Sequence, residues 1–242
     1  MNIQREQQIL QQLQLQAHVK AADLAKILGV SLDTVRRDLK EMESQGHIRC
    51  VRGGACLPES MMAMSHFSGR EVIHIEKKRL AAIKALRHIP SGGLIALNSG
   101  TTNTVLAQEI VKRYSDLTVV TNNLAAASIL MQSASIHTIV IGGDLDIRER
   151  STYGHQCEME FSSYLPDCVF LSINAVDKEA GYTHFRLFEI GIMRALVSRA
   201  KKTVAVMDSS KLGRCSKKQV FDLDAVDVLV MDEVPAEKKE EY

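Results

Sequence analysis

Six short apolar segments in the last two thirds of the chain limit its fold more than any other feature. They read LIAL, LTVV, IHTIVI, CVFL, TVAV and AVDVLV. Each is apolar at consecutive positions, which is the pattern of parallel strands that are covered on both faces. Helical stretches alternate with them, and one precedes the first of them over residues 75–89. Alternating strands and helices predict an open, mostly parallel α/β domain over residues 75–235.

Three short helical patterns and a small hairpin precede this domain. The first covers residues 4–16, the second runs from Ala21 to Leu28, and the third has Ser31 as its N-cap and ends at Gly46. The short link LGVS between the last two helices resembles the turn of a helix-turn-helix. HIRCV and GGACL then predict two β-strands that form a wing. We predict a winged helix-turn-helix over residues 1–57, a linker over 58–74 and a charged tail over 236–242.

The third helix has one apolar face and one charged face. On a helical wheel, Val35, Leu39 and Met42 share one side. The other side carries Asp33, Arg36, Arg37 and Lys40. Such a helix fits the major groove of DNA, where arginine binds guanine or phosphate. The alternative to DNA binding is a charged face that only contacts solvent and carries an Asp33–Arg37 ion pair. The predicted DNA-binding residues are Ser31, Asp33, Thr34, Arg36, Arg37, Lys40, Arg49 and Arg52. The formal net charge is only +1, so DNA binding depends on this local placement of charge.

A second group of polar residues follows the predicted strand LIAL. The loop there reads Asn98-Ser99-Gly100-Thr101-Thr102, and a helix follows it. Free N–H groups at the start of a helix and neighbouring hydroxyls can hold an anion such as phosphate. The alternative is N-capping of that helix by a serine or threonine side chain.

Other predicted strands also end in polar loops, and parallel strands bring such loops to one edge of the sheet. Lys211 would supply a mobile cation for phosphate there, and Asp208 would be a polar neighbour or accept a hydrogen bond from a hydroxyl group. Arg148 and Arg150 are further candidates, with a solvated loop as the alternative. The predicted ligand-binding residues are Asn98, Ser99, Gly100, Thr101, Thr102, Asn122, Gly143, Asp208 and Lys211.

The chain resembles the DeoR family of bacterial regulators. The residues that carry the resemblance are Arg5, Ile9 and Leu13, then VSLDTVRRDLKEME and RGGA. The resemblance extends over nearly the whole chain. It implies a sensor domain that is related in fold to ribose-5-phosphate isomerase and to amino-sugar-phosphate deaminases. The family's loop usually reads Asp-Ser-Gly-Thr-Thr, and Asn98 stands here in the acidic place.

The segment GYTHFRLFEIGIMRAL matches the family's glycine-threonine turn and the helix after it. His184, Arg186 and Glu189 could therefore face the pocket, and a surface or core-edge position is the alternative for each.

Together these features predict a DNA-binding transcriptional repressor of a carbohydrate-metabolism operon, controlled by a phosphorylated sugar. Because operators are usually two-fold, a homodimer or a higher even oligomer is expected. No cofactor, metal or catalytic residue is predicted. One alternative is an isomerase or deaminase with an appended DNA-binding module. The other is an α/β domain that only oligomerises.

The sequence also limits where the protein works. No apolar run approaches the ~20 residues of a membrane helix, and MNIQREQQILQQ lacks the apolar core of a signal peptide. Five cysteines are present, an odd number without paired metal-binding spacing. We therefore expect a cytoplasmic protein with reduced thiols, and a structural zinc is the less favoured alternative.

Overall fold

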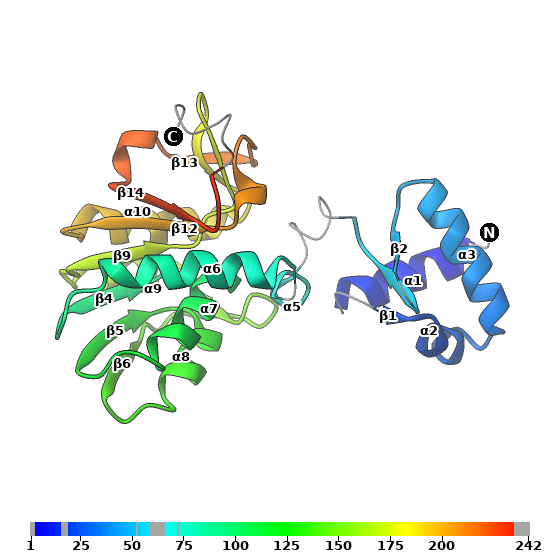
Figure 1. Cartoon of the computed structure of the whole chain (residues 1–242), viewed down its shortest axis with the longest axis horizontal. Helices are drawn as coiled ribbons and strands as arrows, with labels where there is room; N and C mark the ends of the chain where they lie inside the picture. The colour runs from blue at the N-terminus through cyan, green and yellow to red at the C-terminus, as the bar shows by residue number, and fades with distance from the viewer. Residues whose placement is uncertain (1–2, 16–18, 52, 59–65, 72, 235–242) are drawn as a thin grey trace. The chain divides into compact units, whose positions relative to one another are not determined.

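The computed structural model describes residues 3–15, 19–51, 53–58, 66–71 and 73–234 (Figure 1). The chain divides into two compact units, residues 1–73 and 74–242, which we describe one at a time.

The first unit contains the three predicted helices and the predicted hairpin. Apolar side chains from all three helices form its core, among them Ile9, Leu24, Val35 and Met42, each with no exposed surface. Gly29 ends the second helix in the left-handed conformation (φ 63°), as its place in the sequence predicts. The elements are α1 (Ile3–Leu15), α2 (Ala21–Leu28), α3 (Leu32–Ser44), β2 (Arg49–Val51) and β3 (Gly54–Cys56).

A third strand, β1 (Val19–Lys20), was not predicted and lies beside the hairpin. It pairs antiparallel with β3, so that the strand order is β1-β3-β2. The two strands approach closely at Gly54, where a Cβ atom would lie 2.0 Å from the Val19 carbonyl oxygen. This contact is the physical reason for the second glycine of the wing sequence.

The second unit is built on the predicted parallel sheet. All six predicted strands are present, in the order β14-β12-β9-β4-β5-β6, and every pairing among them is parallel. This order brings the ends of β12, β9, β4 and β5 to neighbouring positions. The strands are β4 (Leu94–Leu97), β5 (Leu117–Thr121), β6 (Ile136–Val140), β9 (Cys168–Leu171), β12 (Thr203–Met207) and β14 (Val228–Met231).

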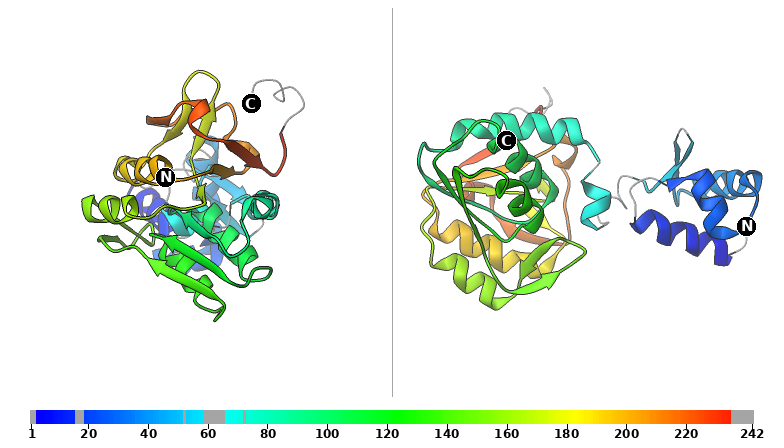
Figure 2. Two further views of the ribbon diagram at one scale, coloured as in Figure 1. Left: turned by 90° about the vertical axis from the view of Figure 1, so that its left-hand side faces the viewer. Right: turned by 90° about the horizontal axis from the view of Figure 1, so that it is seen from below.

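Helices cover both faces of this sheet. Figure 2 shows α6 on one side and α9 and α10 on the other. Alternate strand residues accordingly enter two separate cores, with Leu97 in one and Ala96 in the other. This arrangement explains why the strands are apolar at consecutive positions. The helices on the first face are α6 (Ile75–Ala85), α7 (Thr101–Ile110) and α8 (Leu124–Leu130), and those on the second are α9 (His155–Ser162) and α10 (Ile190–Arg199).

The prediction of one helix over residues 75–89 was too long. The α-helix α6 ends at Ala85, and a 3₁₀ turn, η1 (Leu86–His88), continues from it. Further 3₁₀ turns are η2 (Leu187–Glu189), η3 (Ser209–Lys211) and η4 (Leu223–Ala225).

Two small antiparallel sheets were not predicted. One is the hairpin of β7 (Asp144–Asp146) and β8 (Ser151–Tyr153). The other has the order β10-β11-β13, with β10 (Ala175–Asp177), β11 (Gly181–His184) and β13 (Lys218–Phe221). Their strands have only three or four residues, too few for an alternating pattern to be recognised in the sequence.

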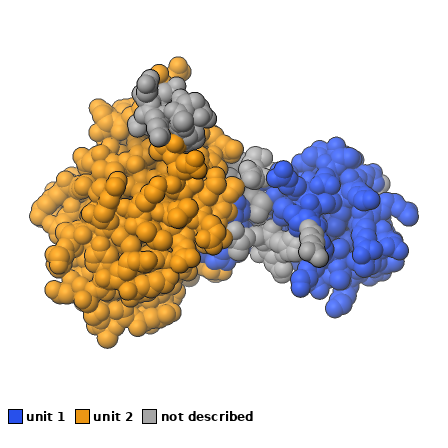
Figure 3. Space-filling view, in the orientation of Figure 1, with its two compact units in different colours: residues 1–73 blue, residues 74–242 orange. Residues whose placement is uncertain are grey.

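The division between the units lies near the end of the predicted linker, between residues 73 and 74 (Figure 3). Part of that linker is ordered as a short helix, α5 (Phe67–Arg70). The remainder over 59–65 and the predicted tail over 236–242 fall outside the described residues. Within the described ranges, no helix is long and apolar enough to span a membrane. All five cysteines are described, and none forms a disulfide.

Candidate functional site

The charged face of α3 points to solvent. Val35, Leu39 and Met42 are at most 3 % exposed and pack in the core of the first unit. The side chains of the opposite face are exposed, namely those of Asp33, Arg36, Arg37 and Lys40. The helix thus presents three cationic side chains, as expected for a helix that contacts DNA.

An exposed ion pair joins two residues of this face. Arg36 Nη1 lies 3.3 Å from Asp33 Oδ1, and both side chains are more than half exposed. The alternative interpretation of this face paired Asp33 with Arg37, whereas the structure pairs Asp33 with Arg36. Exposed pairs of this kind contribute only about 0–1 kcal/mol. This interaction is too weak to keep Arg36 from a base or a phosphate.

The predicted N-cap of α3 is confirmed. Ser31 Oγ accepts a hydrogen bond from the Thr34 backbone N–H at 3.2 Å and lies 2.8 Å from Thr34 Oγ1. The hydroxyl groups of these two predicted contact residues therefore also determine where the helix begins.

Asp38 is the buried acid of α3. It is 4 % exposed and accepts two hydrogen bonds from Arg5 of α1, at 2.9 Å from Nε and 3.2 Å from Nη2. This bidentate pair fixes the first helix against the third, so Arg5 acts in the fold of this unit.

The wing is anchored to the end of α3. The Cys50 N–H donates to Glu43 Oε1 at 2.7 Å, and the Cys50 thiol donates to the Leu39 carbonyl oxygen at 3.6 Å. Burial, with a smaller effect of Glu43, raises the pKa of Cys50 to about 11, so the thiol stays protonated at neutral pH. Arg49 is exposed on β2. Arg52, the other predicted contact of the wing, lies outside the described residues.

In the second unit, the loop after β4 requires a glycine. Gly100 has φ 127°, and a Cβ atom there would lie 2.5 Å from Ser172 Oγ. Gly100 is itself the N-cap of α7, and no side chain caps this helix. The alternative interpretation of Ser99, Thr101 or Thr102 as a capping residue is therefore wrong.

Several side chains at this edge carry a buried oxygen atom that has no hydrogen-bond partner among the described residues. Ser99 Oγ and Thr102 Oγ1 make no hydrogen bond with the described part of the chain, and both residues are at most 1 % exposed. Thr101 beside them is also buried. Asn122 Oδ1 after β5 and Ser151 Oγ in β8 are also buried and have no hydrogen-bond partner among the described residues. A buried polar atom without a partner costs free energy, so these four atoms are suited to receive a ligand.

Asn98 holds this loop in place. Its Oδ1 accepts from the Ser172 N–H at 2.7 Å and from Asn103 Nδ2 at 2.8 Å, and its Nδ2 donates to the Ser172 carbonyl at 3.2 Å. The amide predicted to face a ligand thus joins the ends of β4 and β9. The interactions within the protein make Asn98 a positioning residue.

The loop after β5 connects to its neighbours in the same way. Asn123 caps α8 by accepting from the Ala126 N–H at 3.0 Å, and its Nδ2 donates to the Gly100 carbonyl at 3.0 Å. Asn122 Nδ2 donates to the Thr152 carbonyl at 2.7 Å. These bonds connect the loops after β4 and β5 with β8.

Gly143 acts in packing. It has φ 138°, and a Cβ atom there would lie 2.5 Å from the Tyr153 carbonyl oxygen. The glycine predicted to bind a ligand therefore allows the hairpin β7–β8 to fold back closely after β6.

The loop after β12 brings a cation to the same edge. Lys211 Nζ lies 3.1 Å from the Ile173 carbonyl and 3.8 Å from Asp208 Oδ2, and its side chain is 20 % exposed. Burial alone would raise the pKa of Asp208, but Lys211 and a hydrogen bond from Ser210 hold it below its usual value. Asp208 is therefore ionised at neutral pH.

Sequence reasoning missed the contribution of β9 to this edge. Ser172 and Ile173 contact the loops after β4 and β12, and Asn174 Oδ1 is a further buried atom without a partner in the described part of the chain. Polar residues follow CVFL as they follow the other strands, so the same signal was present there.

His184, Arg186 and Glu189 form a buried ionic network. Arg186 Nε lies 2.7 Å from Glu189 Oε1, Arg186 Nη1 lies 3.0 Å from Glu149 Oε2, and His184 Nε2 lies 3.1 Å from Glu189 Oε2. The surface alternative for these residues is wrong, since none of the three is more than 6 % exposed. Burial alone would raise the pKa of Glu189, yet Arg186 and then His184 hold it far below its usual value.

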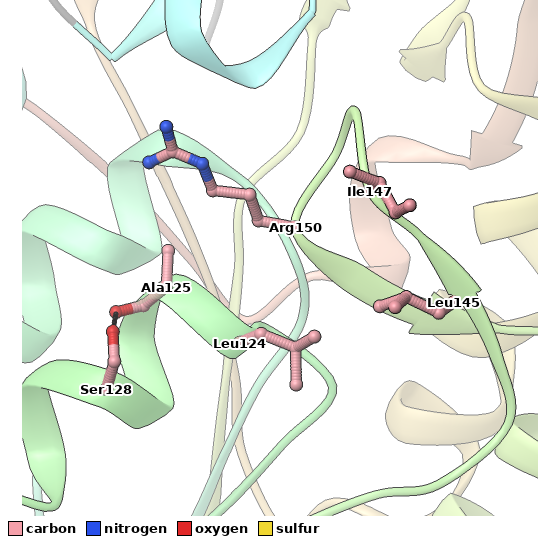
Figure 4. A pocket seen from close by; sticks show the side chains of 6 residues that line it. All are labelled: Leu124, Ala125, Ser128, Leu145, Ile147 and Arg150. Carbon is pink, nitrogen blue, oxygen red and sulfur yellow. Dashed lines mark hydrogen bonds between the residues drawn. The ribbon is translucent and has the colours of Figure 1, made fainter.

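An open apolar pocket of about 320 Å³ lies next to this edge (Figure 4). Leu124 and Ala125 of α8 form one side, and Leu145 and Ile147 of the β7–β8 hairpin form the other. Arg150 lines the pocket, and its carbonyl accepts from the Leu124 N–H at 2.9 Å. Arg150 and Arg148 are both exposed, in agreement with a solvated loop.

An isomerase or deaminase needs a general base, and the buried carboxyl groups of Glu189 and Asp208 are poorly suited to that role. Glu189 forms an ion pair with Arg186. Asp208 accepts hydrogen bonds from Ser210 and lies 3.8 Å from Lys211 Nζ. A general base works best with a pKa near the working pH, whereas both carboxyl groups have lowered pKa values. Among the described residues, no group of three or more histidine, cysteine, aspartate or glutamate side chains could hold a metal ion. Neither of these two carboxyl groups is therefore suited to act as a general base.

Two family models match the chain, one in each unit. Residues 5–61 match the DeoR-like helix-turn-helix domain, and residues 73–233 match the DeoR C terminal sensor domain.

Individual proteins are similar along most of the chain. The glycerol-3-phosphate regulon repressor of Escherichia coli (strain K12) is 30 % identical over 232 residues, which cover 96 % of this chain and 91 % of that protein. The HTH-type transcriptional repressor GlcR of Bacillus subtilis (strain 168) is 31 % identical over 227 residues, or 94 % and 87 % of the two chains. Ribose 5-phosphate isomerase A from Neisseria gonorrhoeae is similar over 61 % of this chain and 56 % of its own, at 15 % identity and a TM-score of 0.43.

The match to the sensor domain alone covers more than half of the chain, and the helix-turn-helix match precedes it. With relatives that are named as repressors, this makes the protein a DNA-binding regulator and not an enzyme. The chain belongs to the DeoR family of bacterial transcriptional regulators.

Proposed function

We propose that this protein represses genes of carbohydrate metabolism and that a phosphorylated sugar or a related metabolite controls its binding to DNA. The observation that carries the proposal is the group of buried hydroxyl and amide oxygens without partners in the described chain, at Ser99, Thr102, Asn122 and Ser151. Ser99, Thr102 and Asn122 follow the ends of the parallel strands β4 and β5, the usual ligand-binding edge of an open α/β sheet. Ser151 of β8 pairs with Asn123 beside them. A relative named for the glycerol-3-phosphate regulon supports a phosphorylated metabolite as effector.

The DNA-binding side of the proposal rests on α3. Its exposed face enters the major groove, which is about 12 Å wide and admits a helix. Arg36 and Arg37 bind guanine edges or phosphates, and Lys40 binds phosphate. Asp33 accepts from a cytosine amino group or orients Arg36, with which it already pairs. Arg49 and Arg52 of the wing contact the DNA backbone.

The effector side rests on the helix α7 and the loops beside it. The first N–H groups of a helix have no partner within the helix, and here they adjoin the hydroxyl groups of Ser99, Thr101 and Thr102. Together with Lys211 these groups bind the phosphate. Asn122 and Asp208 bind the sugar hydroxyl groups. Asn98, Gly100 and Gly143 shape the loops that surround them.

Regulation follows if the effector favours one arrangement of paired DNA-binding modules over another. Two modules are needed for a two-fold operator, so we propose a homodimer or a higher even oligomer that acts in the cytoplasm. The effect on DNA affinity equals the difference in effector affinity between the two arrangements.

The test is a thermal-shift titration of the full-length protein. The probes are glycerol 3-phosphate, glucose 6-phosphate, ribose 5-phosphate and glucosamine 6-phosphate, with inorganic phosphate and the unphosphorylated compounds as references. A binding compound at 100 times its Kd stabilises the folded protein by about 2.7 kcal/mol, which is readily visible as a rise in Tm.

Two lysines on either side of the strand β12 provide a matched pair of variants. Lys211 follows the carboxyl end of β12, whereas Lys201 precedes its amino end and is 74 % exposed. We expect Lys211→Ala to lose the shift and Lys201→Ala to retain it. No shift with any phosphorylated compound, or equal shifts in both variants, would contradict the proposed effector site.

A further inference from the structure

A large apolar side chain is exposed at the start of α3. Leu32 is the first residue of this helix and is 36 % exposed. It is absent from the hydrophobic core of the first unit, where Val35 and Leu39 of the same helix are buried. In the described part of that unit, the other exposed large apolar side chains are those of Ile27 and Val51.

Capping of the helix does not explain a leucine at this position. Ser31 Oγ and the Thr34 N–H make the capping hydrogen bond, and the Leu32 side chain takes no part in it. Leu32 is also outside the buried core, and at 36 % exposure part of its side chain remains accessible to a partner.

The position of Leu32 instead relates it to the charged face. Residues four apart share one side of a helix, so Leu32 lies one turn before Arg36. Recognition helices contact base edges through their N-terminal residues, and Leu32 belongs to the first turn. Unlike Asp33, Arg36, Arg37 and Lys40, its side chain can neither donate nor accept a hydrogen bond.

The major groove offers one apolar feature to such a side chain, the C5-methyl group of thymine. We propose that Leu32 contacts a thymine methyl group and so helps to determine which DNA sequence the protein recognises. The inference rests on the proposed entry of α3 into the major groove. It adds a base preference that the cationic residues do not supply.

Deoxyuridine tests this contact because it differs from thymidine only by that methyl group. A duplex is first selected from a random library with the full-length wild-type protein. Each thymine is then replaced singly by deoxyuridine, and the Kd of each duplex is measured by fluorescence anisotropy. Withdrawal of one methyl group from a buried contact corresponds to about a fourfold loss of affinity.

We expect at least one position in each half-site where deoxyuridine weakens wild-type binding about fourfold. In Leu32→Ala the same replacement should change the Kd less than about 1.5-fold, since the methyl group has lost its partner. Ile27→Ala is the matched control, because Ile27 is also exposed but lies on α2. In Ile27→Ala, deoxyuridine at that position of the duplex should still weaken binding about fourfold. Because Leu32 is outside the core, its variant should fold, which circular dichroism verifies.

A uniform response to deoxyuridine in the wild type, a selected site without thymine, or unchanged sensitivity in Leu32→Ala would each overturn the inference. Arg36→Ala separates this failure from failure of the proposed function. If Arg36→Ala loses the preference for the selected site while the deoxyuridine series is flat, α3 reads DNA without Leu32. If Arg36→Ala binds as the wild type does, the entry of α3 into the groove is itself wrong, and the inference falls with it.

Discussion

Two threonines at the carboxyl edge of the sheet should respond to the same substitution with opposite signs. Thr102 and Thr121 are both fully buried. Thr121 Oγ1 donates to the Leu97 carbonyl at 2.7 Å and accepts from the Asn123 N–H at 3.0 Å. Thr102 Oγ1 makes no hydrogen bond with any described residue. Replacement by valine keeps the shape of the side chain and exchanges the hydroxyl group for a methyl group.

The magnitudes follow from the cost of a buried polar group without a partner, about 1–3 kcal/mol. Thr102→Val removes such a group and should raise the free energy of unfolding by about that amount. Thr121→Val instead deprives the Leu97 carbonyl and the Asn123 N–H of their partner, and should lower it by about 1–3 kcal/mol. Valine and threonine have similar helix propensities, so the place of Thr102 in α7 adds little. The two variants should therefore differ by about 2–6 kcal/mol.

The chain provides its own probe for this measurement. It contains no tryptophan, and its tyrosines are residues 114, 153, 164, 182 and 242, all in the second unit. Urea unfolding of the full-length protein followed by tyrosine fluorescence therefore reports on the unit that contains both threonines. The midpoints and slopes give the free energy of unfolding of each variant.

One result would refute this reasoning. If Thr102→Val destabilises the unit as much as Thr121→Val does, the Thr102 hydroxyl already has a partner in the protein and is not available to a ligand. If the reasoning holds, Thr102→Val is more stable than the wild type and yet loses its response to the effector. Such opposite effects on stability and binding are expected where a site retains polar groups for a ligand.

Two further predictions concern the charges. Arg36→Ala should weaken binding to a selected duplex by about 1–3 kcal/mol and relax its sequence preference, whereas Lys40→Ala should weaken binding to all duplexes alike and reduce the slope of log K against log salt concentration by about 0.9. Anisotropy titrations over a series of KCl concentrations distinguish the two variants. An unchanged slope in Lys40→Ala would show that Lys40 does not contact a phosphate. Because Arg186 and His184 hold the pKa of Glu189 below its ordinary value of 4.5, the unfolded chain binds a proton at this residue first as the pH falls below about 4.5. The free energy of unfolding should therefore fall with decreasing pH in that range, and more steeply in the wild type than in Glu189→Gln. Urea unfolding at a series of pH values measures this. Equal dependence of the free energy of unfolding on pH in the two proteins would contradict the buried pair.

Features that depend on neighbours in the sequence could be predicted well. The six strands are apolar runs, and Ser31 stands directly before a helical pattern, so both could be recognised from local spacing. The loops after β4, β5 and β12 could be assigned to one edge because parallel strands end on the same side. The small sheets escaped prediction because their strands are too short to show a pattern.

Features that depend on distant partners could not be predicted. Arg186 and Glu189 are spaced like residues of an exposed helix, and their burial depends on Glu149, which lies far away in the sequence. Thr102 and Thr121 look alike in the sequence, and only their three-dimensional partners distinguish them. Asn98 was correctly assigned to the polar edge, but its bonds to Ser172 become visible only when β4 and β9 are adjacent.

The segment between β7 and β8 connects the proposed effector site with the ionic network. Ser151 ends this segment and carries a hydroxyl group without a partner in the described chain, while Glu149, two residues earlier, binds Arg186. Arg186 in turn binds Glu189, the residue directly before α10. A ligand that bonds Ser151 would therefore act on the segment that also positions Glu149 in its buried ion pair with Arg186. Removal of one partner from a buried ion pair costs about 3–5 kcal/mol. Because a buried pair tolerates few alternative geometries, we expect a shift of this segment to disturb Arg186 and, through Glu189, the start of α10. An effector can use this constraint to favour one arrangement of the unit, and linkage requires that operator DNA then changes effector affinity by the same factor.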